Sequence, residues 1–291
     1  MELRQLTYFL TVLETGSLTA AAEQLGLTQQ ALSRSLARLE EQLGGKLFDR
    51  EARGMAVTRL GDTIAEHARP IVAEARRLRD AANAELGLER GRLVVGLSPV
   101  AATTAAGAKV MQFALNHPNV RIDVESGIDV DFVAALHRGD IDMAISGHLG
   151  GTVDSVLIEQ LSVEQWGVAG CKTNKRLAKA RHLSDLASHR WIIGRNTAEL
   201  DARIVESFVE AGLPAPRPGV VTTSGMFILN ILRFSDCLAI LPRSKCELID
   251  NLQWRDFSNG TWNTPIFLMR RKRALTDGFV RALLREFGVA A

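Results

Sequence analysis

The polar side chains of one helical segment form the clearest chemical pattern in the sequence. Residues 27–44 read LTQQALSRSLARLEEQLG, and glutamine, serine and arginine come before the first acidic residue, Glu40. At about 100° per residue, the leucines fall on one side and the polar residues opposite or beside it. Arginine pairs with guanine O6 and N7, and glutamine with adenine N6 and N7. The pattern therefore predicts a face that reads DNA bases; the alternative is an ordinary solvated helix face.

The elements before this segment predict how it is held. Apolar residues repeat at helical spacing from Leu3 to Leu13, and Gly16 ends that helix. Ser17 or Thr19 can cap a short second helix, Gly26 forces a turn, and Thr28 can cap the third helix. Two short helices joined by a tight turn form a helix-turn-helix, whose second helix enters the major groove with its N-terminal part.

Basic residues gather around this candidate interface although they do not exceed the acidic ones. The first sixty residues contain seven basic and seven acidic side chains, and most of the bases follow Gln30. Arg50 and Arg59 flank EARGMAVT, a turn-and-strand pattern that contains Arg53. A wing at this place would contact phosphates, which orient a protein on the duplex without reading its sequence.

Taken in order, residues 9–64 resemble the N-terminal signature of the LysR-type transcriptional regulators. The matching features are Ser17-x-Thr19-x-Ala21-Ala22, Ser33-Arg34, Leu39-Glu40, Leu43-Gly44-x-x-Leu47-Phe48-x-Arg50 and VTRLGDTI. Members of this family have about three hundred residues, so the resemblance should cover the whole chain. It implies a winged helix-turn-helix at 1–58, with Gln29, Gln30, Ser33, Arg34 and Arg38 facing DNA and Arg50 and Arg53 near its backbone.

Residues 59–88 predict a long linker helix that joins two copies of the chain. Its small and large apolar residues follow an alternating four-three spacing, as in a coiled-coil seam: Ile64, Ala68, Ile71, Ala75, Leu78 and Ala82. The alternative is a helix packed on its own domain. Pro70 lies within the seam and should bend the helix. The resembled regulators dimerise through such a helix and often form tetramers.

The remaining residues, 89–291, alternate strand and helix patterns, which indicates an α/β fold with mainly parallel strands. The pattern restarts near Trp166. We therefore expect two α/β subdomains, one of residues 91–162 and 266–291 and the other, inserted in it, of residues 163–265. The resemblance implies the same arrangement, an effector-binding domain like the periplasmic binding proteins with a ligand in the cleft.

The ends of the expected strands supply candidate effector-binding residues. Ligands of open α/β sheets bind beyond the carboxyl ends of the strands, and these ends hold Ser98, Val100, Gly127, Ser146, Gly147, Arg195, Asn196, Thr222 and Thr223. Hydroxyls and amides at helix starts suit a small anion, and Arg195 could pair with a carboxylate. An organic or aromatic acid is therefore the expected effector class. For each residue the alternative is capping or turn chemistry.

One short segment departs from the pattern of the resembled family. The family usually has a Gly-x-Gly turn before the strand that ends at Pro242, whereas this chain has Ser235 and Asp236 there. We expect a local turn variant in which Asp236 acts as a cap. The difference weakens any transfer of effector identity from other members of the family.

Composition and missing motifs limit the other functions. The chain has 291 residues, a net charge of +2 and three cysteines. No apolar run is long enough for a membrane helix, and the N-terminus lacks a signal-peptide core. The histidines and cysteines lack metal-ligand spacing, and no catalytic motif is present. We expect a cytoplasmic regulator without metal or cofactor that is not an enzyme, binds double-stranded DNA and a small effector, and contacts RNA polymerase as a further candidate partner. The alternative is a soluble small-molecule-binding protein without a DNA function.

Overall fold

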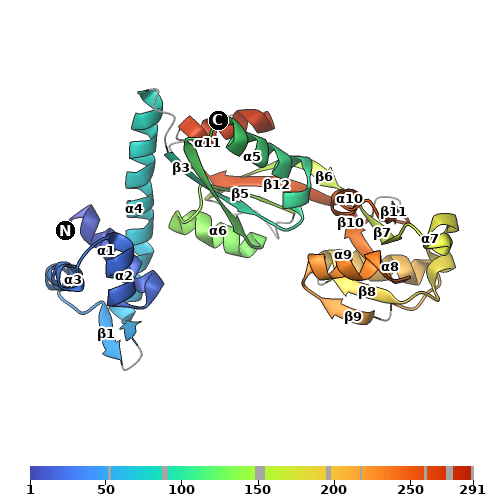
Figure 1. Ribbon diagram of the computed structural model, residues 1–291, viewed down its shortest axis with the longest axis horizontal. Coiled ribbons are helices and arrows are strands. Elements are labelled where there is room, and N and C mark those ends of the chain that lie inside the picture. The colour runs from blue at the N-terminus through green and yellow to red at the C-terminus, as the bar shows by residue number, and fades with distance from the viewer. Residues whose placement is uncertain are drawn as a thin grey trace.

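The computed structural model describes residues 1–51, 54–86, 91–147, 155–194, 198–216, 218–258, 261–272 and 278–289. Along the chain it forms an N-terminal helical domain, one long helix and a region with two separate sheets (Figure 1). Among these residues, no helix is long and apolar enough to cross a membrane.

The N-terminal domain contains the predicted three helices followed by a hairpin. These are α1 (Leu3–Thr15), α2 (Leu18–Leu25), α3 (Gln29–Leu43), β1 (Phe48–Glu51) and β2 (Gly54–Val57). The Ser17 hydroxyl accepts a hydrogen bond from the Ala20 amide, and the Thr28 hydroxyl accepts one from the Ala31 amide. Thr28 therefore caps α3 as predicted, and Ser17, one of the two predicted candidates, caps α2 in place of Thr19. Gly16 and Gly26 end helices with left-handed backbone.

The long helix α4 (Arg59–Glu85) follows directly and includes Pro70. The predicted seam is wrong in its first part. Ala68 is only 1% exposed, and both Ala68 and Ile64 pack in the core of the N-terminal domain of the same chain. Their small-large alternation thus serves an intrachain contact. Ile71 and Leu78 remain exposed, at 47% and 71%, while Ala75 is partly buried and Ala82 is exposed.

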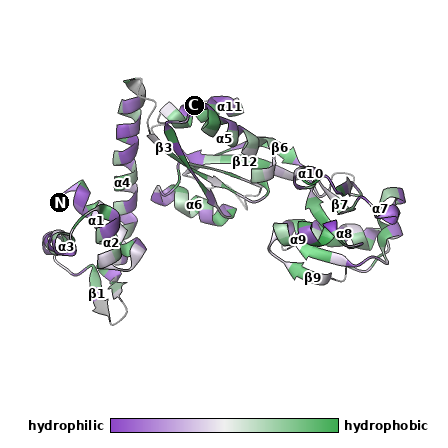
Figure 2. Ribbon diagram, viewed as in Figure 1, coloured by the Kyte–Doolittle hydropathy of each residue, from purple (hydrophilic) through white to green (hydrophobic). Residues whose placement is uncertain are grey.

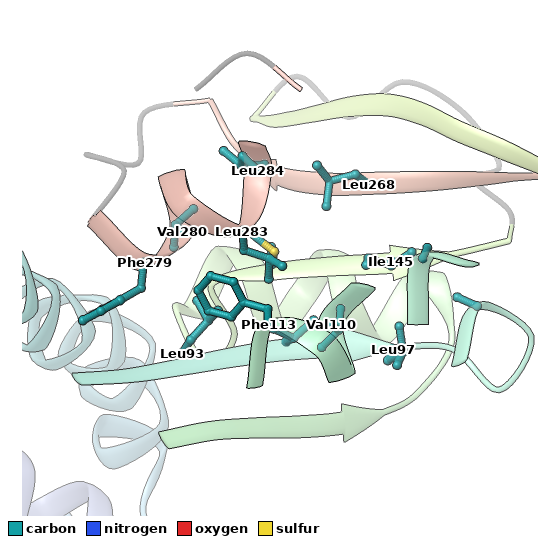
Figure 3. Packing of buried hydrophobic residues seen from close by; sticks show 14 of the residues in the cluster. Leu93, Leu97, Val110, Phe113, Ile145, Leu268, Phe279, Val280, Leu283 and Leu284 are labelled. Carbon is teal, nitrogen blue, oxygen red and sulfur yellow. The ribbon is translucent and has the colours of Figure 1, made fainter. Parts of the chain in front are cut away.

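The first sheet has the order β4-β3-β5-β12-β6. Its elements are β3 (Gly91–Leu97), the 3-10 helix η1 (Ala101–Thr103), α5 (Ala105–Asn116), β4 (Val120–Ser126), α6 (Asp129–Arg138), β5 (Met143–Ser146), β6 (Val156–Glu164), β12 (Thr264–Arg271) and α11 (Gly278–Phe287). Phe113 of α5 and Leu283 of α11 pack with Leu93 of β3 in one core (Figure 3). The first subdomain is therefore completed by β12 and α11, which come from the end of the chain.

The second sheet has the order β11-β7-β10-β8-β9. Its elements are β7 (Trp166–Cys171), α7 (Lys175–Lys179), the 3-10 helix η2 (Leu183–Leu186), β8 (Trp191–Gly194), α8 (Ala198–Glu210), β9 (Pro218–Thr222), α9 (Gly225–Arg233), β10 (Leu238–Pro242), α10 (Arg243–Glu247) and β11 (Leu252–Arg255). Figure 2 shows the hydrophobic character of β10, which is buried along its whole length. This sheet has a core on each face.

The structure confirms the predicted fold class and adds two strands that the sequence pattern did not indicate. β6 and β11 pair antiparallel with β12 and β7. Neither has the continuous apolar run of a buried strand, because β6 is largely exposed or half-buried and β11 lies at a sheet edge. The expectation of mainly parallel strands is wrong, because β4-β3-β5 and β10-β8-β9 are parallel but the remaining pairs, including β12 with β5 and β10 with β7, are antiparallel.

Candidate functional site

The outer face of α3 carries the predicted polar side chains. Gln29, Gln30, Arg34 and Arg38 are exposed, and Ser33 is partly buried. The opposite face contributes Leu32, Leu36 and Leu39 to the core. This two-sided helix leaves amide and guanidinium groups free to contact a ligand as large as DNA.

The acidic end of α3 has a structural role. The Glu40 carboxylate accepts hydrogen bonds from Lys46 Nζ at 2.7 Å and from the Leu47 amide at 2.9 Å. These contacts fix the turn between α3 and the hairpin. Glu40 is therefore paired with a cation of the turn. The N-terminal half of α3 contains no acidic residue.

Hydrogen bonds to the α1–α2 turn and to the segment after α3 hold the hairpin in place. The Met55 amide donates to the Gly16 carbonyl at 3.1 Å, and the Thr58 hydroxyl donates to the Lys46 carbonyl at 2.7 Å. A hollow of about 410 Å³ lies between helix and hairpin, and its lining includes Ser33. Arg50 lies in β1 opposite Met55. Arg53 lies outside the described residues.

In the first sheet, three of the predicted effector residues lie at one edge. Strands β4, β3 and β5 are parallel neighbours, so their carboxyl ends lie side by side. Gly127 and Ser98 directly follow β4 and β3, and Ser146 is the last residue of β5. The Ser98 hydroxyl accepts from the Ala101 amide at 3.3 Å, and the Ser146 hydroxyl donates to the carboxylate of Asp129. The Ser98 hydroxyl therefore has the capping or turn role that was the alternative interpretation, whereas the Ser146 hydroxyl joins β5 to the first residue of α6.

Val100 and η1 join this edge to the second sheet. Val100 packs against a core of each subdomain. The Thr103 and Ser244 hydroxyls lie 2.8 Å apart and share a hydrogen bond, and the Ser244 amide donates to Glu164 Oε1 at 2.9 Å. The carboxyl edges of the two sheets thus meet at η1 and α10.

In the second sheet, the predicted residues lie at the ends of β8 and β9. Gly194 pairs with Thr222 in a parallel register, which places the carboxyl ends of these strands together. The Thr222 hydroxyl accepts from the Ser224 amide at 3.0 Å, and Thr223 is exposed. Arg195 and Asn196 lie outside the described residues.

Lys245 was missed by the sequence analysis, although it follows the carboxyl end of β10. The strand-end rule applied to the segment LAILP would have found it, because β10 is parallel to β8. The side chain is partly buried, and this burial lowers the pKa of its ammonium group. Its Nζ lies only 2.7 Å from the point that a Cβ on Gly225 would occupy.

The turn before β10 is built by Ser235 and not by the predicted cap, Asp236. The Ser235 hydroxyl donates to the Ile231 carbonyl at 2.8 Å and accepts from the Cys237 amide at 3.3 Å. The backbone carbonyl of Asp236 accepts from Asn174 Nδ2 at 3.2 Å. A hydroxyl thus supplies the contacts that stabilise this glycine-free turn.

A concave site of about 500 Å³ lies away from the predicted effector residues. It is lined by Lys172, Arg243, Cys246, Glu247, Ile249, Asp250, Leu252 and Trp254. Arg243 fills part of its rim, because the guanidinium contacts Glu247 at 2.8 Å and stacks over the Trp254 ring. At the strand ends, in contrast, polar groups from both subdomains converge.

A buried ion-pair cluster attaches α4 to the first sheet. Asp142 accepts from Arg76 Nη2 at 2.8 Å, from Arg77 Nε at 2.9 Å and from the Val94 amide at 2.9 Å. Nearby, burial raises the pKa of the Asp80 carboxyl, partly offset by Arg76. Movement of the first subdomain would therefore be transmitted to α4 through charged groups.

The described residues give no support for a metal centre, because no group of three or more potential ligands gathers among them. Cys246 is buried, which raises the pKa of its thiol to about 12. The pKa of the Cys171 thiol is lowered by hydrogen bonds from Thr173, but Cys171 is also buried. Neither thiol lies in a built catalytic arrangement.

Comparisons with known proteins agree with this geometry. Residues 3–62 match the bacterial regulatory helix-turn-helix proteins of the lysR family, and residues 86–289 match the LysR substrate binding domain. The SDS degradation transcriptional activation protein of a Pseudomonas species is 30% identical over 83% of this chain and 79% of its own length. The nitrogen assimilation regulatory protein nac of Klebsiella aerogenes is 29% identical over 74% and 70%. The crystal structure of the LysR regulator CbnR is similar in fold, with a TM-score of 0.72, 22% identity and coverage of 99% of this chain and 98% of that chain.

Proposed function

Because the chain belongs to the LysR family of bacterial regulatory helix-turn-helix proteins, we propose that α3 reads its operator through Gln29, Gln30, Ser33, Arg34 and Arg38. The chain is a DNA-binding transcriptional regulator with an effector-binding domain. The observation that carries the proposal is the exposed polar face of α3 opposite a leucine core. Arg50 and Arg53 would contact the phosphate backbone from the wing.

The effector binds where the carboxyl edges of the two sheets meet. This assignment is supported by Val100, which packs on both subdomains, and by the hydrogen bond between Thr103 and Ser244. The residues proposed to line the site are Ser98, Val100, Gly127, Ser146, Arg195, Asn196, Thr222 and Thr223. A ligand that contacts both edges favours one subdomain arrangement over another, which shifts a preexisting equilibrium.

The change in subdomain arrangement is transmitted to the DNA-binding domain through α4. Arg76 and Arg77 attach this helix to Asp142 of the first subdomain, and Ala68 attaches it to the N-terminal domain. A single helix with both attachments can convert subdomain movement into a new orientation of α3. Regulation of this type requires only that the effector bind the two arrangements with different affinity.

The active form contains at least two copies, since a helix-turn-helix usually reads a two-fold site. Two exposed apolar regions support this, one on α4 with Ile71 and Leu78 and one on α5 and the edge strand β4 with Met111, Leu115 and Val124. Two different contacts of this kind would give a tetramer. Regulation of transcription places the protein in the cytoplasm, and we infer that it is not an enzyme.

Substitution of Arg34 tests the proposal at its central residue. We expect Arg34→Ala to weaken binding to the operator by about 1–3 kcal/mol if the side chain contacts a base. Fluorescence anisotropy on the DNA upstream of its own gene, against a scrambled duplex and across a salt series, measures this loss.

Gln42→Ala is the matched control, because Gln42 is exposed at the opposite end of α3. It should bind DNA as the unmodified protein does. Equal affinity of Arg34→Ala and the unmodified protein for the operator would exclude Arg34 as a base-reading residue. Absence of binding to any duplex at low salt would favour the alternative, a small-molecule-binding protein without a DNA function.

A further inference from the structure

We infer that Lys245 is the anion-binding residue of the effector site and that the effector carries a carboxylate group. The inference rests on the proposed effector site between the two subdomains. It adds a charged residue to that site and assigns it to the side of the second subdomain.

The position of Lys245 follows from the strand order. β10, β8 and β9 are parallel, so α10 and α9 begin at the same edge of the second sheet. Ser244, the residue before Lys245, contacts Thr103 of the first subdomain at 2.8 Å. Lys245 thus lies one residue from a direct contact between the subdomains. Figure 1 shows α10 at this junction.

The ammonium group lies against the first residue of α9. A Cβ on Gly225 would be 2.7 Å from Lys245 Nζ, so glycine at this position leaves the room that the ammonium needs. The Ser224 hydroxyl accepts from the Phe227 amide. Gly225 and Met226 precede Phe227 in α9, and their amides donate to no acceptor within the described part of the chain.

This arrangement brings two positive groups together. The amides at a helix N-terminus carry a partial positive charge, and the lysine adds a full one. No carboxylate of the described residues forms an ion pair with Lys245, and its burial lowers the pKa of the ammonium group. An uncompensated, partly buried cation at such a place is typical of a binding site.

A carboxylate satisfies both groups at once. One oxygen can accept from the lysine ammonium, and the other can accept from the free amides of α9. The uncharged amide of the same acid lacks the charge that this pair favours. The site should therefore distinguish an acid from its amide, and the distinction should depend on Lys245.

The test measures binding of a fixed panel of acids to the full-length protein by thermal shift and titration calorimetry. The panel is benzoate, salicylate, succinate and 2-oxoglutarate, each compared with its uncharged amide. We expect at least one acid to bind while its amide does not. Lys245→Met should then lower the affinity for that acid about ten- to a hundred-fold, which is the usual contribution of a hydrogen bond to a charged group. Lys245→Arg should retain most of the affinity.

Lys172→Met is the control, because Lys172 is a lysine of the same subdomain but is exposed and lines the separate hollow beside Trp254. It should leave acid binding unchanged. Unchanged acid binding by Lys245→Met, or no binding by any acid of the panel, would overturn the inference. DNA binding measured on the same proteins without acid keeps this result separate from a failure of the proposed regulator function.

Discussion

At the scale of single residues, Asp142 illustrates how one buried carboxylate joins two parts of the chain. Its side chain is 1% exposed, and it accepts hydrogen bonds from Arg76 and Arg77 of α4 and from a backbone amide of β3. A buried charge of this kind is tolerated only when it is paired. Removal of the negative charge would take the closest carboxylate from the buried Arg77 and the partly buried Arg76, whose other acidic neighbours are Glu74, 3.3 Å from Arg77, and Asp80, 4.0 Å from Arg76.

We therefore expect Asp142→Asn to reduce the free energy of unfolding by about 3 kcal/mol, since breaking a buried ion pair by removing one partner costs roughly 3–5 kcal/mol. Urea unfolding of the full-length protein provides the measurement. Asp140→Asn is the control, because that side chain is 32% exposed and pairs with Arg138 at the surface. It should cost about 1 kcal/mol or less. Equal losses for the two variants would contradict a special role for Asp142.

At the scale of elements, α4 contacts two domains along its length. Its first half packs on α1, and its second half packs on α6, α11 and β3. The contact with α6 is close, because Gly139 ends α6 at φ 77° and a Cβ there would lie 2.8 Å from Ala73 Cβ. A glycine at this position thus meets two requirements, a left-handed backbone and room for the neighbouring helix.

Replacing each of two glycines by alanine separates the backbone requirement from the packing requirement. Gly212 has φ 70°, and a Cβ added to it would meet no atom of the described residues within 4 Å, so Gly212→Ala should cost only the backbone strain, about 1–2 kcal/mol. Gly139→Ala should cost about 1–3 kcal/mol more, because the added methyl overpacks the contact with α4. Thermal and urea unfolding measure both losses. A Gly139 variant as stable as the Gly212 variant would show that α4 does not press on α6.

At the scale of the whole molecule, exposed apolar residues indicate how copies of the chain assemble. The first part of the predicted seam is used within the chain, whereas Ile71 and Leu78 on the same helix remain exposed. Exposed leucine and isoleucine on a helix that already packs on two domains favour a contact with a second copy. The hydrophilic character of much of α4 in Figure 2 confines such a contact to a narrow stripe.

The double change of Ile71 and Leu78 to lysine should lower the mass of the assembly in sedimentation equilibrium, because it introduces like charges into an apolar contact. Affinity for a two-fold operator should fall with it. Leu248→Lys serves as the control, since the exposed fraction of Leu248 lies between those of Ile71 and Leu78 but Leu248 belongs to the second subdomain. An unchanged mass for the double variant would remove α4 from the assembly contact.

The sequence by itself determined the elements whose patterns are local. Caps at Ser17 and Thr28, the leucine face of α3 and most of the buried strands were predicted because helix and strand periodicity depends on neighbours along the chain. The polar face of α3 was found for the same reason, since a helix fixes which side chains share a surface.

Only the tertiary structure decided which groups meet across long distances in sequence. It decided that Ala68 packs within its own chain, that Asp142 holds α4 and that Lys245 lies against Gly225. It also added β6 and β11, whose exposed or edge positions remove the apolar run that marks a buried strand. Such contacts depend on how separate elements pack, and periodicity along one element contains no information about its partner.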